Sequence, residues 1–178
     1  MQFIDVVLLI TIGSFALFGF WFGFIHTLGS LLGTVFGAYL ASRYYEPMAD
    51  WLVGITSWSQ NGARVLMFII AFVIINRLVG FIFWILDKVF GLVTHLPFIR
   101  SIDRIFGTIL GLFEGVITVG LVFYFIERFP VSEKIMNAVA HSFVVPKTVA
   151  VATLLIPFLP EALKLLRSTV DFVEKKIL

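Results

Sequence analysis

A stretch of 37 residues without a formal charge, from Val6 to Ser42, limits what this chain can fold into. A single helix of that length would measure about 55 Å, whereas the hydrocarbon core of a bilayer is about 30 Å thick. The stretch therefore predicts two membrane spans joined by a turn. We expect the turn within residues 19–26, where two glycines relax the backbone and a tryptophan and a histidine suit a membrane interface.

The composition of the whole chain agrees with a membrane location. Hydrophobic residues make up 60% of the sequence and charged residues 13%, with a mean hydropathy of +1.06, whereas a soluble domain carries about 25% charged residues. The start of the chain lacks the basic region of a signal peptide, so the first apolar run is predicted to be retained as a span. The small net charge of +2 argues against a nucleic-acid partner.

The remaining apolar runs complete a polytopic bundle. Arg43–Pro47 combines charged, aromatic and proline residues and is interpreted as the end of the second span. We predict an all-α membrane helical bundle with four transmembrane helices in two hairpins, followed by C-terminal amphipathic or interfacial helices. The expected four-span domain covers residues 1–130 and the C-terminal region 131–178. The predicted spans are residues 3–18, 24–41, 65–86 and 105–126.

The C-terminal region has a different pattern. Residues 144–160 are apolar but contain three prolines and a lysine, and the clean run within them has only 12 residues. That length favours an interfacial or re-entrant segment over a fifth span. Residues 161–178 repeat apolar side chains at alternating spacings of three and four, which predicts an amphipathic helix. A helix on the membrane surface is favoured over a coiled coil, because the pattern lasts only about two heptads.

Lysine and arginine near the ends of the spans indicate the orientation. Four spans place both termini on the same side. The terminal side carries four such residues and the opposite side three, which favours cytoplasmic termini. The residues counted are Arg43, Arg64, Arg128 and Lys134 on the first side, and Lys88, Arg100 and Arg104 on the second.

Two of the predicted spans carry glycines at four-residue spacing. Such ladders leave a smooth stripe that lets helix backbones approach closely, so we expect them to hold spans together. Lining of a pore or of an oligomer axis is the alternative, and a ladder could also pack against a second copy of the chain. The ladders are Gly29, Gly33 and Gly37 in the second span, and Gly107, Gly111 and Gly115 in the fourth.

Two charged residues fall near the midpoints of neighbouring predicted spans, Arg77 in the third and Glu114 in the fourth. A charge at the bilayer centre costs about 2.5–3.5 kcal/mol on insertion scales. A buried ion pair between them, with Asn76 beside it, would offset part of that cost. This polar site is either a static clasp between helices or an ion-sensitive site facing a wet cavity.

Three other charged residues have positional interpretations. We expect Asp5 to cap the first span and Asp103 to cap the fourth, because negative charge is favourable at a helix N-terminus. Arg104 is expected at the lipid headgroups.

The chain lacks the patterns that usually carry catalysis. It has no cysteine, which excludes disulfides and zinc-thiolate sites. Its three histidines, His26, His95 and His141, show no metal-ligand spacing. Nucleophile-elbow, phosphate-loop and dinucleotide-binding motifs are also missing. We therefore expect no enzymatic activity, no cofactor and no metal.

Several short motifs occur in an order that resembles the CvpA family, which is named for colicin V production. The resemblance covers most of the chain. Two positions depart from the family pattern, since Glu114 and Phe22 replace residues that are usually basic. The matching features are Asp5, Gly23-Phe24, residues 41–45, Asp103-Arg104 followed by the glycines at 107, 111 and 115, Ser142-x-x-x-Pro146, and the prolines at 157 and 160.

This resemblance implies a protein of the bacterial inner membrane that is linked to toxin production or export and to envelope maintenance. The first functional hypothesis is a non-enzymatic membrane protein of this kind, with the lipid bilayer and an export system as partners. The second is a small channel or ion-coupled transporter that uses Arg77 and Glu114. The third is an oligomeric membrane scaffold built on the glycine ladders.

Overall fold

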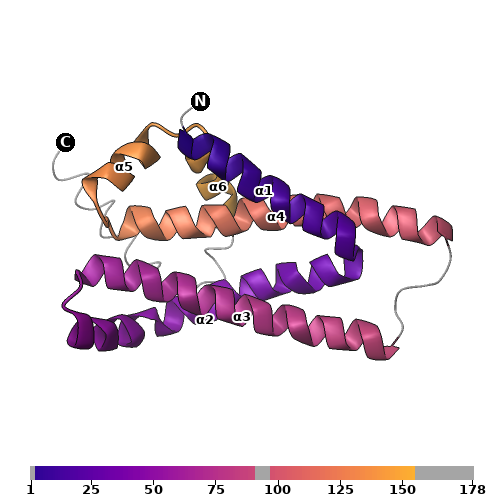
Figure 1. The fold of residues 1–178 in the computed structure, drawn as a ribbon, viewed down its shortest axis with the longest axis horizontal. Helices are drawn as coiled ribbons and strands as arrows, with labels where there is room; N and C mark the ends of the chain where they lie inside the picture. Colours follow the sequence, from indigo (N-terminus) through magenta and orange to yellow (C-terminus); the bar gives the residue numbers. More distant parts are fainter. Residues whose placement is uncertain (1–2, 91–96, 155–178) are drawn as a thin grey trace.

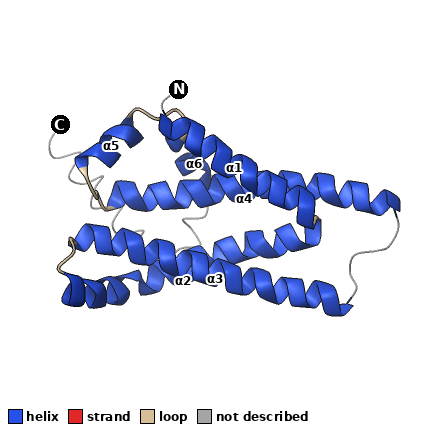
Figure 2. Cartoon of the chain, in the orientation of Figure 1, coloured by secondary structure: helices blue, strands red, loops and turns tan. Residues whose placement is uncertain are grey.

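The computed structural model describes residues 3–90 and 97–154, and within these ranges every regular element is a helix (Figures 1 and 2). Four long helices run back and forth along the molecule, and two short ones follow the fourth. The helices are α1 (Phe3–Phe22), α2 (Phe24–Thr56), α3 (Gln60–Phe90), α4 (Pro97–Arg128), α5 (Glu133–Ala140) and α6 (Val145–Ala152).

The four long helices are long and apolar enough to cross a membrane, which confirms the predicted membrane bundle. All four helices are longer than the predicted spans, and two boundaries differ by more than five residues. Helix α2 does not end near 41 but continues through Pro47 to Thr56. Helix α4 begins at Pro97 and not at 105, so Asp103 and Arg104 lie inside it. In both cases the helix continues through the charged residues that were interpreted as its end or its start.

The predicted turn between the first two spans is confirmed and consists of one residue. Gly23 separates α1 from α2 and has a φ of 85°, a left-handed conformation that favours glycine. Its N–H still donates to the Gly19 carbonyl at 2.9 Å, so the first helix is closed by backbone bonding before the chain reverses.

The closest packing does not follow the two predicted hairpins, which paired α1 with α2 and α3 with α4 (Figure 1). Helix α1 packs along α4, and α2 packs along α3 and also contacts α4. The backbones of α3 and α4 approach each other at only a few points. The two helices meet instead through aromatic side chains, where the Phe68 and Phe125 rings stack at 3.8 Å between centroids.

Buried apolar residues form a main core at one end of the bundle. Tyr45 of α2 packs edge-on against Phe125, while Phe72 continues the stack from Phe68. A second cluster joins α1 and α4 to the short helices through Leu8, Ile12, Val119, Val139, Val144 and Val145. Many other large apolar side chains face outward, as expected in contact with lipid.

Helices α5 and α6 meet at an angle of 89°. Together they have the length and composition of either a broken span or a re-entrant segment, so the preference for an interfacial or re-entrant segment at residues 144–160 stays a prediction. Helix α6 packs on α4 at Gly120, where an added Cβ would lie 2.1 Å from the Thr148 carbonyl oxygen. The remainder of that segment, and the predicted amphipathic helix at 161–178, lie outside the described residues.

Candidate functional site

A cluster of polar side chains lies inside the bundle where α2, α3 and α4 come together. The Glu114 carboxylate of α4 is only 4% exposed and accepts a hydrogen bond of 2.5 Å from the Ser30 hydroxyl of α2. Thr34, one turn further along α2, donates its hydroxyl to the Ser30 backbone carbonyl at 3.2 Å. Asn76 of α3 donates its amide Nδ2 to the Thr34 hydroxyl at 2.7 Å.

We call these four residues, Ser30, Thr34, Asn76 and Glu114, the polar cluster. Sequence reasoning found Glu114 and Asn76 but missed the two hydroxyls. Their spacing of four residues, which puts both on one face of an apolar helix, was the available signal. The cluster satisfies the buried carboxylate with a neutral donor, which lowers the cost of holding it away from water.

The predicted ion pair between Arg77 and Glu114 does not form as a direct contact among the described residues. Arg77 is exposed on α3 and acts on Glu114 only through its electrostatic field. The prediction assumed that α3 and α4 pack directly as neighbours. Instead α2 provides the Ser30 hydroxyl that reaches the carboxylate, and the α3 and α4 backbones stay apart.

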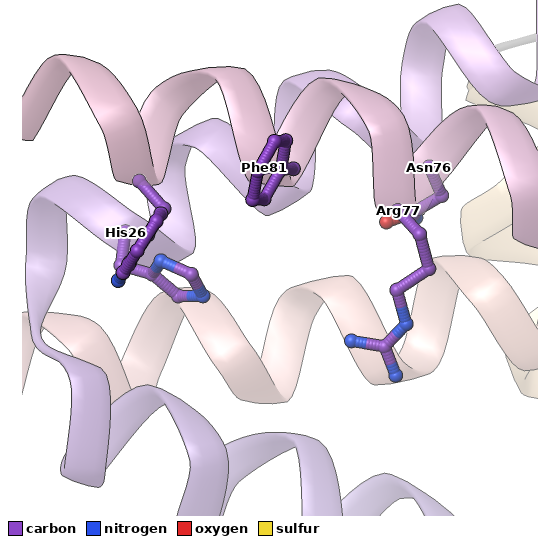
Figure 3. Close-up of a pocket in the computed structure, with 6 residues that line it drawn as sticks. His26, Asn76, Arg77 and Phe81 are labelled. Carbon is purple, nitrogen blue, oxygen red and sulfur yellow. The ribbon is translucent and has the colours of Figure 1, made fainter.

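Arg77 lines a pocket of about 200 Å³. Figure 3 shows His26 at the start of α2 and Arg77, Asn76 and Phe81 on α3 around this space. Gly80 and Trp84 complete the described lining. Asn76 belongs to both the pocket and the polar cluster, so the two sites share one residue.

The glycine ladder of α2 faces α3. A Cβ at Gly33 would lie 2.9 Å from the Asn76 carbonyl oxygen, and one at Gly37 would lie 3.2 Å from that of Phe72. At Gly29 it would overlap the Phe83 side chain. This close approach positions Asn76 opposite α2, where its amide can reach Thr34.

The glycine ladder of α4 faces α1. A Cβ at Gly111 would lie 2.3 Å from the Phe15 carbonyl oxygen, and Gly107 faces Gly19 in the same way. Gly115 approaches Ile12. Both ladders are thus covered within one chain, and an oligomer that keeps this fold would have to use another surface.

Asp103 does not cap its own helix, because α4 starts six residues before it. Its carboxylate crosses to the start of α2 and accepts from the Phe24 backbone N–H at 3.0 Å. A Cβ at Gly23 would lie 1.9 Å from the same carboxylate. Glycine is therefore required at this turn both by its φ and by the carboxylate above it. Arg104, the next residue, places its guanidinium over the Phe20 ring of α1, 5.4 Å from the centroid.

Asp5 likewise serves another helix. Its side chain is only 1% exposed although it lies in the first turn of α1. One carboxylate oxygen accepts from the Ser142 hydroxyl at 2.6 Å and from the Phe143 and Val144 N–H groups at 3.0 and 3.3 Å. The Ser142 hydroxyl in turn accepts from the Val145 N–H at 3.1 Å. These contacts satisfy the N–H groups that the start of α6 leaves unpaired.

The chemistry of the polar cluster is that of a single carboxylate. Within the described residues, no group of three histidine, aspartate or glutamate side chains could hold a metal ion. One carboxylate with two hydroxyls and an amide can hold a proton or a small cation, and it can also serve as a static clasp between helices.

Comparison with known proteins supports the resemblance seen in the motifs. The family model described as colicin V production protein matches residues 4–153. A colicin V production protein of Escherichia coli (strain K12) is 26% identical over 130 residues, which cover 72% of this chain and 76% of the relative. No solved structure matches. Since the family model spans all six described helices, the chain belongs to the colicin V production protein family.

Proposed function

We propose that this protein supports the production or export of a colicin V-like toxin, or maintenance of the cell envelope, without catalysing a reaction itself. The observation that carries this proposal is the family match across residues 4–153. The four membrane-length helices are consistent with a multi-pass protein. We place it in the bacterial inner membrane with cytoplasmic termini, on the balance of lysine and arginine near the span ends. An export system is the expected partner.

The test is complementation of the Escherichia coli relative. A colicin V-producing strain that lacks the relative is given this chain, and growth inhibition of a sensitive lawn is measured. Restored inhibition is the expected result. A chain that is present in the membrane but restores no inhibition contradicts the proposal. Asp50→Asn, at an exposed position on α2, is the control for expression and folding.

A second candidate function is a small ion-coupled transporter or channel. The observation that favours it is the polar cluster, which places a buried carboxylate within membrane-length helices beside a pocket. Buried ionisable groups in membrane spans commonly mark ion or proton paths.

Purified protein in liposomes tests this second function through its proton leak. Glu127 is exposed near the end of α4, and Glu127→Gln is the control. Transport through the cluster is supported if Glu114→Gln abolishes the proton leak and Glu127→Gln retains it. An identical leak in wild type and Glu114→Gln contradicts a path through this carboxylate and leaves the cluster as a structural clasp.

A further inference from the structure

The pocket beside Arg77 opens near one end of the bundle. His26 follows the Gly23 turn by three residues, and that turn is held by Asp103 of α4. Trp84 of α3 lies at the same end of the pocket, and the charged residues Asp87 and Lys88 follow it in the sequence. Tryptophan and clustered charges are typical of the membrane interface. The pocket therefore extends from this interface toward Arg77.

Arg77 is about two helical turns deeper than Trp84, because seven residues of helix rise by about 10 Å. It is exposed within a span of mean hydropathy 2.6. Placing a cation at this depth in lipid costs free energy. The cost falls if the long side chain extends toward the interface or if the cation meets an anion. Glu114 does not provide that anion in direct contact, because α2 lies between α3 and α4 at this level and the α3 and α4 backbones meet at only a few points.

The lining of the pocket suits an anion with an apolar part. Among the six described residues that line it, none is acidic. In Figure 3 Arg77 and Asn76 lie at one end of this space, His26 lies at the other end, and Phe81 lies between them. Trp84 adds a second aromatic side chain to the lining. Phe81 and the neighbouring Leu78 and Ile82 are each more than half exposed, so apolar surface continues outward from the pocket toward lipid.

We propose that this pocket binds the phosphate group of an anionic phospholipid, held by Arg77. The acyl chains lie against the outward apolar surface of α3, and the guanidinium provides charge-assisted hydrogen bonds to the phosphate oxygens. The lipid reaches the site from the bilayer, which already surrounds this face. The site is separate from toxin export or ion transport and does not depend on either proposed function.

The absence of native cysteine gives a direct test. Gly80 lines the pocket, and a Cβ there would meet nothing within 4 Å, so Gly80→Cys introduces a single thiol without a clash. Gly54→Cys, also with open space and outside the pocket, is the matched control. Both full-length variants are placed in nanodiscs of phosphatidylcholine alone or with phosphatidylglycerol, and the rate of labelling by a maleimide is measured.

Phosphatidylglycerol is expected to slow labelling of Gly80→Cys about tenfold, as expected for a ligand held by hydrogen bonds to a charged group. Labelling of Gly54→Cys should not change. Adding Arg77→Gln should remove the protection, whereas Arg43→Gln, an exposed arginine on α2, should leave it intact. Equal labelling in both lipids, or protection that survives Arg77→Gln, would overturn the proposal.

A second measurement covers the case in which the thiol reacts poorly. Native mass spectrometry of the cysteine-free protein counts bound phosphatidylglycerol and phosphatidylcholine in wild type, Arg77→Gln and Arg43→Gln. A retained phosphatidylglycerol that is lost only in Arg77→Gln supports the site. Equal retention in all three proteins refutes it. Protection of Gly80→Cys by inorganic phosphate but not by phosphatidylglycerol would show a site for soluble phosphate and would also refute the lipid proposal.

Discussion

Replacing Asp5 should release α6 from the bundle in two distinguishable steps. Three donors, the Ser142 hydroxyl and the Phe143 and Val144 N–H groups, bind the same carboxylate oxygen. Asp5→Asn keeps an oxygen at that place but removes the charge. Asp5→Ala removes the acceptor altogether, and of the three donors the Val144 N–H keeps a second acceptor, the Ser142 hydroxyl.

The two substitutions should therefore differ in magnitude. A charge-assisted hydrogen bond is roughly twice as strong as a neutral one, so the loss of charge in Asp5→Asn should cost about 1 kcal/mol. In Asp5→Ala the Ser142 hydroxyl and the Phe143 N–H each lose an acceptor, at about 1 kcal/mol each, for a total of about 2 kcal/mol. The Ser142 hydroxyl still accepts from the Val144 and Val145 N–H groups and retains part of the cap in both variants.

Global stability is measured by detergent-induced unfolding, and the local effect by thiol accessibility at Val145→Cys. Val145 is 0% exposed, so its thiol should react only when α6 separates from the bundle. Reactivity should increase in the order wild type, Asp5→Asn, Asp5→Ala. The exposed Asp50→Ala is the control and should behave as wild type. Equal effects of Asn and Ala at position 5 would refute the capping argument.

Three further predictions concern packing and the second cap. Gly111→Ala should lower the free energy of unfolding by about 1–3 kcal/mol, because the added Cβ overlaps the backbone of α1. Gly13→Ala, which has open space around it, should leave the free energy of unfolding unchanged. Phe125→Ala should cost about 3–5 kcal/mol in the same unfolding assay, since it removes the ring that joins α3 to α4. Asp103→Ala should cost about 1 kcal/mol and speed hydrogen exchange in the first turn of α2; unchanged exchange there would contradict its capping role.

The number and approximate place of the spans could be predicted because lipid imposes them along the chain. In lipid, a run such as residues 6–42 can satisfy its backbone hydrogen bonds only as helices. Because the run is too long for one crossing of the hydrocarbon core, the thickness of the bilayer divides it into two spans. The end of α2 could not be predicted in this way. Tyr45 packs on Phe125, and Ala49 lies in a cluster with Ala63. These tertiary contacts, between residues far apart in sequence, continue the helix beyond the polar and proline residues that suggested its end.

The roles of the two aspartates were also beyond local reasoning. Asp5 binds a segment 137 residues away, and Asp103 binds one 79 residues away. The residues at both ends of these contacts nevertheless occur among the motifs of the family resemblance. Asp5 pairs with Ser142, and Asp103 pairs with Gly23-Phe24. Motifs that were noted separately along the sequence thus form two contacts in space.

The position of Glu114 was predicted from depth alone, and its partners were not. Position along the spans places Arg77 and Glu114 at similar depths in the bilayer, but it does not show which helix lies between them. The α2 ladder draws α3 against α2, and the α4 ladder turns toward α1, so each ladder faces a different helix. The carboxylate consequently receives the Ser30 hydroxyl of α2, and Arg77 is directed to the pocket.

Asn76 connects the pocket to the buried carboxylate. It lines the space beside Arg77, and its amide donates to Thr34. Thr34 in turn donates to the backbone carbonyl of Ser30, whose hydroxyl binds Glu114. The bundle is fixed by Asp5 and α6 at one end and by Asp103 and the Gly23 turn at the other. The described side chains in the second half of α3 take no part in these contacts and pack against the α2 ladder at Gly29 and Gly33. A ligand that moved this half of α3 would strain the Asn76–Thr34 bond first, so occupancy of the pocket and the hydrogen bonding of Glu114 should change together.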